Sequence, residues 1–302
     1  MRIGLGSVIT PVFSGGVGRS GTTIVGKVLR NHPQVLAGSP FEIKFITEVN
    51  GLIDLVFGKR SFMPTQISKK GYWLSKIGVR DSMRVRFLKF RHRIHNDWWR
   101  RTNRLGMESG LHRALTMRDL DALLEELEGS LDSPIEAARN FVFGYVKRHR
   151  KWQGETLWMD TTPANMMYAD YIHRIFPEGK FIEMRRDPLD NIASVLKESW
   201  GPNDPSRAIV WWKDRISLAT QAKSGIPSQN YLTMYLEDLV LRNRHSCYEA
   251  LLSHLGLEDE GRMRNYFEME VRSDRANIGR WKRDFSDSNG FLELFNKLTS
   301  QG

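Results

Sequence analysis

The stretch PVFSGGVGRSGTTIVGKVLRNHP, residues 11–33, decides how the rest of the chain is interpreted. Its first residues, up to Phe13, favour a short buried strand. Glycines then follow in close succession, which is typical of a turn that other residues cannot make. From Ile24 to Leu29 apolar residues recur with helical spacing. A strand, a glycine-rich turn and a helix N-terminus together predict an anion cradle, because unpaired N–H groups and the helix dipole favour negative charge there.

The spacing from Gly16 to Thr23 matches the phosphate-binding template G-x-x-x-x-G-K-S/T with one departure. Thr22 stands where the lysine that reaches the β- and γ-phosphates of a nucleoside triphosphate is expected. The basic residue lies three positions earlier, as Arg19. The stretch is therefore expected to bind a phosphate group, but not that of ATP. The alternative is a turn that only joins a strand to a helix.

This stretch resembles the sulfotransferases that use 3′-phosphoadenosine-5′-phosphosulfate (PAPS). Their 5′-phosphosulfate loop reads K/R-x-G-T-T or close to it, and residues 19–23 look most like the arginine version in tyrosylprotein and many bacterial sulfotransferases. The resemblance implies a loop that binds the donor through Gly18, Arg19, Ser20, Gly21, Thr22 and Thr23.

A second strand-to-helix junction carries an arginine and a serine. Residues 181–184 favour a strand, Arg186 lies at its carboxyl end, and Ser194 follows eight positions later. Open α/β sheets bind ligands at the carboxyl ends of their strands, and an arginine with a hydroxyl group can clamp a phosphate. A surface ion pair of Arg186 with a nearby aspartate is the alternative. The spacing resembles the 3′-phosphate motif of PAPS sulfotransferases, which implies that Arg186 and Ser194 bind that phosphate.

Three further segments resemble the same family less closely. Residues 158–163 resemble a strand that ends in K-T-P, although a threonine replaces the lysine, so no role of that lysine is carried over. Residues 235–239 resemble a Y-E-D-L strand end with the tyrosine displaced by one position. Residues 277–282 resemble the C-terminal G-x-W-K segment that covers the donor. That likeness implies Arg275 and Arg280 as 3′-phosphate contacts, although the R-K-G triplet of the family is absent.

Glu42 is the candidate general base, which an attacking hydroxyl group needs. It follows the glycine-rich stretch closely, and residues 42–45 resemble the E-x-H-F segment of heparan sulfate sulfotransferases, in which the glutamate is the base. The resemblance implies a PAPS-dependent O-sulfotransferase in which Arg19 is the second catalytic residue and stabilises charge on the leaving phosphate. The alternative for Glu42 is a carboxylate at a helix start, which Ser39 and Pro40 also predict.

The remaining patterns predict an α/β protein. Strands are expected near 35–38, 156–159, 180–184 and 230–235. Helices are expected over 164–176, 189–200, 206–223, 244–255 and 290–298. This alternation predicts a three-layer fold like that of the P-loop nucleoside triphosphatases, with a central, mostly parallel sheet flanked by helices. Only helical patterns occur between 55 and 150, which predicts a helical insertion. This insertion is expected to recognise the acceptor, and the whole chain, residues 1–302, is expected to form one domain.

The net charge of +10 is unevenly distributed along the 302 residues. Nine basic and two acidic residues lie between Arg80 and Arg104, so this segment, 80–104, carries +7. Such a face suits a polyanionic glycan, an acidic lipid surface or nucleic acid, and a solvated helix face is the alternative. Its aromatic residues either contact the acceptor or form the buried seam of a helix. They are Phe87, Phe90, Trp98 and Trp99.

Several functions are excluded or left open by composition. No run of about 18 apolar residues predicts a membrane span, and no leader peptide is expected. The single cysteine, Cys247, indicates a reducing, cytoplasmic location, and no metal site is expected from the Cys and His spacing. The expected partner is a hydroxyl-bearing acceptor, such as a glycan, a lipid-linked alcohol or a small alcohol, and the basic segment favours an anionic one. Peripheral membrane contact fits this expectation, and the oligomeric state stays open.

Two other functions compete with sulfuryl transfer. The first is a P-loop kinase or nucleotide-binding protein, which Thr22 disfavours. The second is a nucleic-acid-binding protein that uses the basic segment 80–104, although no nucleic-acid partner is expected.

Overall fold

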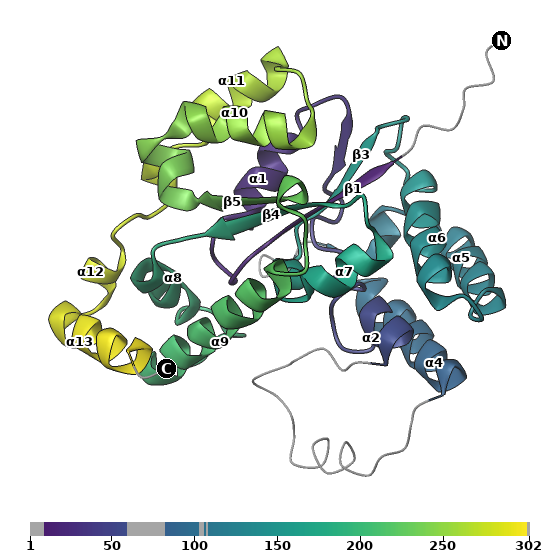
Figure 1. The fold of residues 1–302 in the computed structure, drawn as a ribbon, viewed down its shortest axis with the longest axis horizontal. Coiled ribbons are helices and arrows are strands. Elements are labelled where there is room, and N and C mark those ends of the chain that lie inside the picture. The colour runs from purple at the N-terminus through teal and green to yellow at the C-terminus, as the bar shows by residue number, and fades with distance from the viewer. Residues whose placement is uncertain (1–8, 59–81, 103–105, 107, 301–302) are drawn as a thin grey trace.

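The computed structural model describes residues 9–58, 82–102, 106 and 108–300 (Figure 1). Its parallel strands form one five-stranded sheet in the order β2-β3-β1-β4-β5. The strands are β1 (Thr10–Gly15), β2 (Val35–Ala37), β3 (Leu157–Asp160), β4 (Lys180–Arg185) and β5 (Tyr231–Tyr235). In this register, Phe13 of β1 pairs with Asp160 of β3 and Phe181 of β4. The predicted α/β fold with a mostly parallel central sheet is confirmed.

Helices cover both faces of this sheet, because successive strand residues are buried on opposite sides. Val12 and Ile182 pack with one set of helices, and Phe13 and Phe181 pack with another. The first set comprises α1 (Thr22–Leu29), α10 (Arg244–Leu255) and α11 (Gly261–Glu270). The second set includes α7 (Ala169–Ile175) and α9 (Pro205–Lys223). Figure 1 shows the two sets on opposite sides of the sheet.

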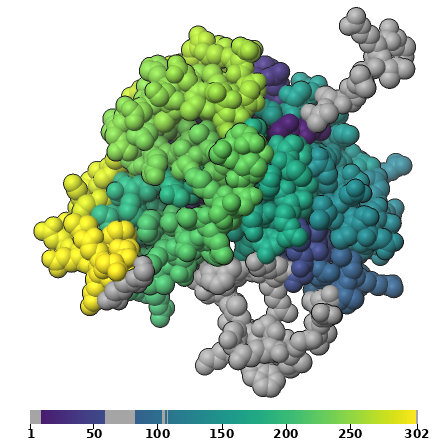
Figure 2. Space-filling model, in the orientation of Figure 1, coloured from purple at the N-terminus to yellow at the C-terminus, as the bar shows by residue number. Residues whose placement is uncertain are grey.

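Shorter elements connect this framework and extend it at the C-terminus. The remaining α-helices here are α8 (Pro188–Val195), α12 (Trp281–Asp284) and α13 (Ser288–Thr299). Short 3-10 turns cover Pro163–Tyr168, Ser228–Asn230 and Ser273–Arg275, and a π-turn covers Asp238–Arg242. Phe291 of α13 packs in one cluster with residues of α8 and α9, and Figure 2 shows α13 beside α9 at the surface.

The described elements between β2 and β3 are helical except for one bridge between Thr102 and Glu108. They are α2 (Leu52–Phe57), α4 (Met83–Arg93), a π-turn (Ile94–Trp98), a 3-10 turn (Leu111–Arg113), α5 (Met117–Gly129) and α6 (Pro134–Lys147). Residues 59–81 of the predicted insertion, with Arg80, and Arg104 at the end of the basic segment lie outside the described residues.

The aromatic residues of the basic segment belong to the core. Phe87, Phe90 and Trp98 are at most 1% exposed, and Trp99 packs partly buried against the same cluster. The expectation that these aromatic rings contact the acceptor is therefore wrong for the first three, and the buried-seam interpretation holds. The exposed face of this segment carries basic side chains, among them Arg84, Arg91 and Arg100.

The predicted helix that starts at Ser39 is not formed. Instead, the N–H of Ile43 donates to Asp160 Oδ1 at 3.2 Å and the N–H of Lys44 donates to Thr162 Oγ1 at 3.3 Å. Ser39 and Lys44 adopt positive φ angles of 61° and 64°, which a helix does not allow. Bonds to the end of β3 thus replace the bonds that a local helix would make, and they hold this loop at the carboxyl edge of the sheet.

Candidate active site

The glycine-rich loop between β1 and α1 forms an open anion cradle. Gly21 precedes α1 with φ of 102°, no side chain caps the helix, and its first turn has no acidic residue. Its N-terminal N–H groups and its dipole therefore favour a negatively charged ligand. A Cβ atom at Gly16 would lie 2.3 Å from the carbonyl oxygen of Met184, so the loop can approach β4 only with glycine there. The buried Oγ of Ser20 has no hydrogen-bond partner among the described residues, which suits a bound anion.

Two arginines from distant segments meet at the hydroxyl group of Ser194. Arg19 Nε donates to Ser194 Oγ at 3.2 Å, and Arg280 Nη1 donates to the same oxygen at 3.0 Å. Arg19 Nε also lies 3.4 Å from Glu198 Oε1. The structure thus brings together three residues that the sequence predicted for donor binding, and it adds a carboxylate that the sequence analysis missed.

Arg186 lies beside this point but bonds mainly to backbone. Its guanidinium donates to the carbonyl oxygens of Ala276 at 3.0 Å, Asn277 at 2.9 Å and Arg19 at 3.4 Å, and lies 3.9 Å from Asp190. Its side chain is 5% exposed, and this burial lowers the pKa of Arg186. Its Nε has no partner in the described part of the chain. Arg186 therefore joins the loop to the C-terminal segment and retains a donor for a further acceptor atom.

Helix α8 also holds the glycine-rich loop and the C-terminal segment around Gly279 in place. Asp190 accepts hydrogen bonds from the N–H groups of Gly279 at 2.6 Å and Trp281 at 3.1 Å. Asn191 Nδ2 donates to the carbonyl oxygen of Gly18 at 3.2 Å. Arg275 does not join this group, because it forms an ion pair with Glu270 at a half-exposed position.

Glu42 lies on the loop that β3 anchors. Its carbonyl oxygen accepts from Arg101 Nη2 at 2.7 Å, and its carboxylate lies 4.0 Å from Lys44 Nζ. Burial in the cavity raises the pKa of Glu42, and the positive charge of Lys44 offsets part of this rise. Asp160 accepts from the N–H of Ile43 and from the hydroxyl of Thr162, and burial raises the pKa of Asp160 to about 6.

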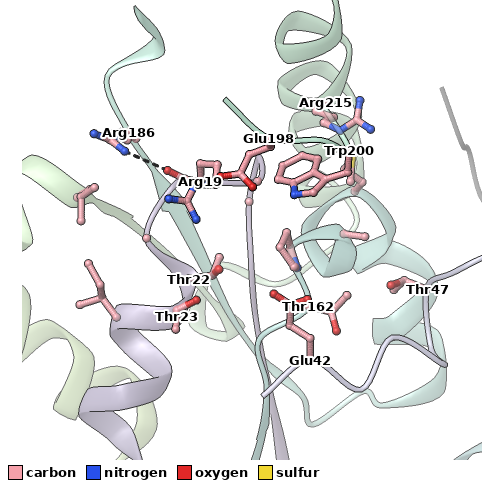
Figure 3. A pocket seen from close by; sticks show the side chains of 18 of the residues that line it. Arg19, Thr22, Thr23, Glu42, Thr47, Thr162, Arg186, Glu198, Trp200 and Arg215 are labelled. Carbon is pink, nitrogen blue, oxygen red and sulfur yellow. Dashed lines mark hydrogen bonds and ion pairs between the residues drawn. The ribbon is translucent and has the colours of Figure 1, made fainter. Parts of the chain in front are cut away.

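One cavity of about 650 Å³ joins these features (Figure 3). Most of the predicted site residues line it: Gly18, Arg19, Gly21, Thr22, Thr23, Glu42, Arg186, Arg275 and Arg280. Ser20 and Ser194 are each 1% exposed and lie beneath the residues that line the cavity. Figure 3 shows Arg186 and Arg19 on one side of the cavity and Glu42 and Thr162 below its centre.

Sequence reasoning missed an aromatic wall of the cavity. It consists of Trp200 and Trp211, and Arg215 lines the same space beside them. The predicted helix 189–200 ends earlier, at Val195, so Trp200 is carried over the loop, where a Cβ at Gly18 would lie 2.7 Å from its ring. No local pattern indicated this fold-back.

Two kinds of feature are absent from the described ranges. They contain no group of three or more His, Cys, Asp or Glu residues that could hold a metal ion. They also contain no helix whose length and apolar character suit a membrane crossing.

The proteins that are similar to this chain include two sulfotransferases of known structure. Sulfotransferase STF9 from Mycobacterium avium aligns over 98% of this chain and 77% of its own, at 13% identity and a TM-score of 0.48. The sulfotransferase domain of the Synechococcus PCC 7002 olefin synthase aligns over 100% and 91%, at 17% identity and a TM-score of 0.49. Nodulation protein NoeE of Sinorhizobium fredii is 29% identical over 116 residues, which span 38% of this chain and 26% of that protein. A family model described as "Sulfotransferase family" matches residues 11–261. The chain therefore belongs to the sulfotransferase family.

Proposed function

We propose that the chain is a PAPS-dependent O-sulfotransferase. The observation that carries this proposal is the meeting of Arg19 and Arg280 on Ser194, beside the uncapped start of α1, in a cavity that also holds Glu42. PAPS has two anionic ends, and the site offers two groups of donors. The loop from Gly18 to Thr23 would hold the 5′-phosphosulfate, and Ser194, Arg280 and the unpaired Nε of Arg186 would hold the 3′-phosphate. Membership of the sulfotransferase family supports the assignment.

The chain's own residues have distinct roles in this proposal. Bound PAPS supplies an activated sulfuryl group. Glu42 accepts the proton of the acceptor hydroxyl at its carboxylate, and Lys44 favours the ionised form of that carboxylate. Arg19 and the N–H groups of the loop are placed to stabilise negative charge that builds on the leaving phosphate. No metal ion is part of the proposed reaction.

The cofactor assignment is tested by nucleotide binding, because a kinase and a sulfotransferase need different phosphates. Calorimetry should show that 3′-phosphoadenosine-5′-phosphate (PAP) binds more tightly than ADP or ATP with Mg²⁺. Transfer of radioactive sulfate from labelled PAPS to a library of hydroxyl compounds should then reveal turnover. Equal affinity for PAP and ADP would contradict the proposed donor, and tight binding of an oligonucleotide alone would favour the nucleic-acid alternative.

Substitution of Arg186 by alanine is expected to weaken PAP binding by about 1.5–3 kcal/mol, the range for a hydrogen bond to a charged group. ADP, which lacks the 3′-phosphate, should bind with unchanged affinity. The measurement is calorimetric titration of both nucleotides. Arg283→Ala is the matched control, because Arg283 is exposed on α12 and does not line the cavity. If PAP and ADP lost affinity equally, Arg186 would only hold the backbone of the loop and the C-terminal segment, and would not contact the 3′-phosphate.

The pH dependence of turnover should report Glu42. Only the carboxylate can accept a proton, so kcat/KM is expected to fall as pH decreases through a pKa above the ordinary value of 4.5. The Lys44 charge lowers the pKa of Glu42, so Lys44→Met should shift this acid limb to higher pH. A pH–rate profile of both proteins, with the exposed Lys27→Met as control, measures the shift. An acid limb that Lys44→Met leaves in place would argue against Glu42 as the base.

The acceptor and the location of the protein belong to the same proposal. We infer a hydroxyl-bearing acceptor whose hydroxyl group reaches Glu42 in the cavity. A cytoplasmic location rests on the single cysteine, and contact with a membrane surface rests on the exposed basic face of α4.

A further inference from the structure

Arg215 of α9 is a half-buried cation that lines the cavity and has no carboxylate partner among the described residues. Its guanidinium lies 3.7 Å from the centre of the Trp211 ring and donates to the Trp211 carbonyl oxygen at 3.4 Å. Among the residues that the structure describes, no carboxylate forms an ion pair with Arg215, and Asp214 and Tyr168 act on it electrostatically. The side chain is thus held by stacking and by one long hydrogen bond.

This arrangement differs from that of several other half-buried arginines that the structure describes. Arg139 forms an ion pair with Glu178 at 2.6 Å, and Arg185 forms one with Glu183 at 2.9 Å. Arg101 has no carboxylate partner in the part of the chain that the structure describes, but its Nη2 donates to two carbonyl oxygens, at 2.7 and 3.3 Å. Burial lowers the pKa of Arg215 to about 10, although Tyr168 and Asp214 offset part of this fall. Removal of a cation from water is unfavourable unless an anion compensates, so an anion is the group that this position lacks.

The position of Arg215 separates it from the donor residues. Figure 3 shows Arg215 and Trp200 on the side of the cavity opposite Arg186, with Glu42 and Thr162 below. Trp200 is 46% exposed, and its ring lies 6.0 Å from that of Trp211. This side of the cavity therefore offers a cation beside an exposed aromatic ring, in the same cavity as the candidate base.

We propose that Arg215 binds an anionic group of the acceptor, a carboxylate, sulfate or phosphate, while the Trp200 ring packs against the ring of the molecule that carries it. The inference rests on the proposed function, because it assigns the acceptor of that same site. A planar guanidinium can bind two oxygens of such a group at once, which orients the molecule as well as attracting it. Arg215 is thus a specificity residue that would hold an acidic acceptor with its hydroxyl group toward Glu42.

The test is direct binding to the PAP-loaded protein. The probes are p-nitrophenyl β-glucoside, the corresponding glucuronide and the 6-phosphate of the glucoside, which share an aromatic ring and sugar hydroxyls but differ in charge. Calorimetry should show that at least one anionic probe binds about ten-fold more tightly than the glucoside, as one charged hydrogen bond allows. The relative affinity of glucuronide and phosphate identifies the anion.

Variants on α9 assign the effect to Arg215. Arg215→Gln should remove the preference for the anionic probe, and Arg215→Lys should retain part of it. Arg207→Gln on the same helix is the matched control, because its side chain is 77% exposed and does not line the cavity. Equal affinity for all three probes, undetectable binding of all three, or a preference that survives Arg215→Gln would each overturn the inference. PAP and ADP titrations of the same proteins report on the donor separately, so failure of the proposed function is distinguishable.

Discussion

Replacement of Glu42 by glutamine is expected to lower kcat for sulfuryl transfer by about 10²–10⁴-fold, the usual contribution of a general base. Glutamine has nearly the same shape, but its amide cannot accept the proton of the acceptor hydroxyl. The affinity for PAP should not change, because Figure 3 shows Glu42 low in the view, away from Arg186. Initial rates with labelled PAPS and calorimetry with PAP measure the two effects separately.

The matched control for this variant is Glu48→Gln. Glu48 lines the same cavity and forms an ion pair with Lys44 at 3.3 Å, so it tests whether loss of any carboxylate near Lys44 is enough. Its Oε2 also accepts a hydrogen bond from Trp98 Nε1 at 2.9 Å, which assigns Glu48 a structural contact. We expect Glu48→Gln to retain most of the turnover. A Glu42→Gln protein that turns over normally would transfer the role of base to another carboxylate, with Glu198 the first to test.

The sheet could be predicted from sequence because its strands are short, mostly apolar and separated by clear helical patterns. The expected strand at 180–184 became β4 (Lys180–Arg185), and the expected strand at 230–235 became β5 (Tyr231–Tyr235). The helix at 244–255 was predicted at the residues it occupies. In these segments the local preference and the packing of the fold agree.

The segment from Ser39 to Ile46 could not be predicted in the same way. Its serine, proline and glutamate are a local helix signal, but its backbone N–H groups bond to Asp160 and Thr162, more than 100 residues away. These long-range bonds override the local preference. The early end of α8 at Val195 is a comparable case, because the apolar pattern continues to Trp200 while the chain turns back over the loop.

The residues of the candidate site also fall into a group that the sequence predicted and a group that it did not. The sequence motifs indicated Arg19 and Ser194, and the structure joins them although 175 positions separate them. Their chemistry could be inferred because each belongs to a motif that follows a strand: Arg19 precedes α1, and Ser194 lies on α8. Glu198 and Arg215 carry no motif, since their importance depends only on which residues face them after folding.

Replacement of Arg19 is expected to reduce turnover far more than stability. Arg19 has φ of 73°, a region that asparagine tolerates better than alanine, so Arg19→Asn removes the charge with little backbone strain. Loss of one group that stabilises developing negative charge costs about 10²–10³ in kcat. Stability should change little, because the Arg19 side chain is 47% exposed and such ion pairs contribute at most about 1 kcal/mol.

The decisive measurement compares kcat and the melting temperature of Arg19→Asn with those of Arg19→Lys and Lys27→Asn. Lysine keeps the charge but not the planar group that reaches both Ser194 and Glu198, so Arg19→Lys should fall between the wild-type protein and Arg19→Asn. Lys27 is exposed on α1, and its replacement should leave turnover unchanged. Arg19→Asn could melt as the wild-type protein does and still transfer the sulfuryl group at a normal rate. In that case another residue stabilises the charge on the leaving phosphate. Arg280, which donates to the same Ser194 hydroxyl, is then the residue to replace.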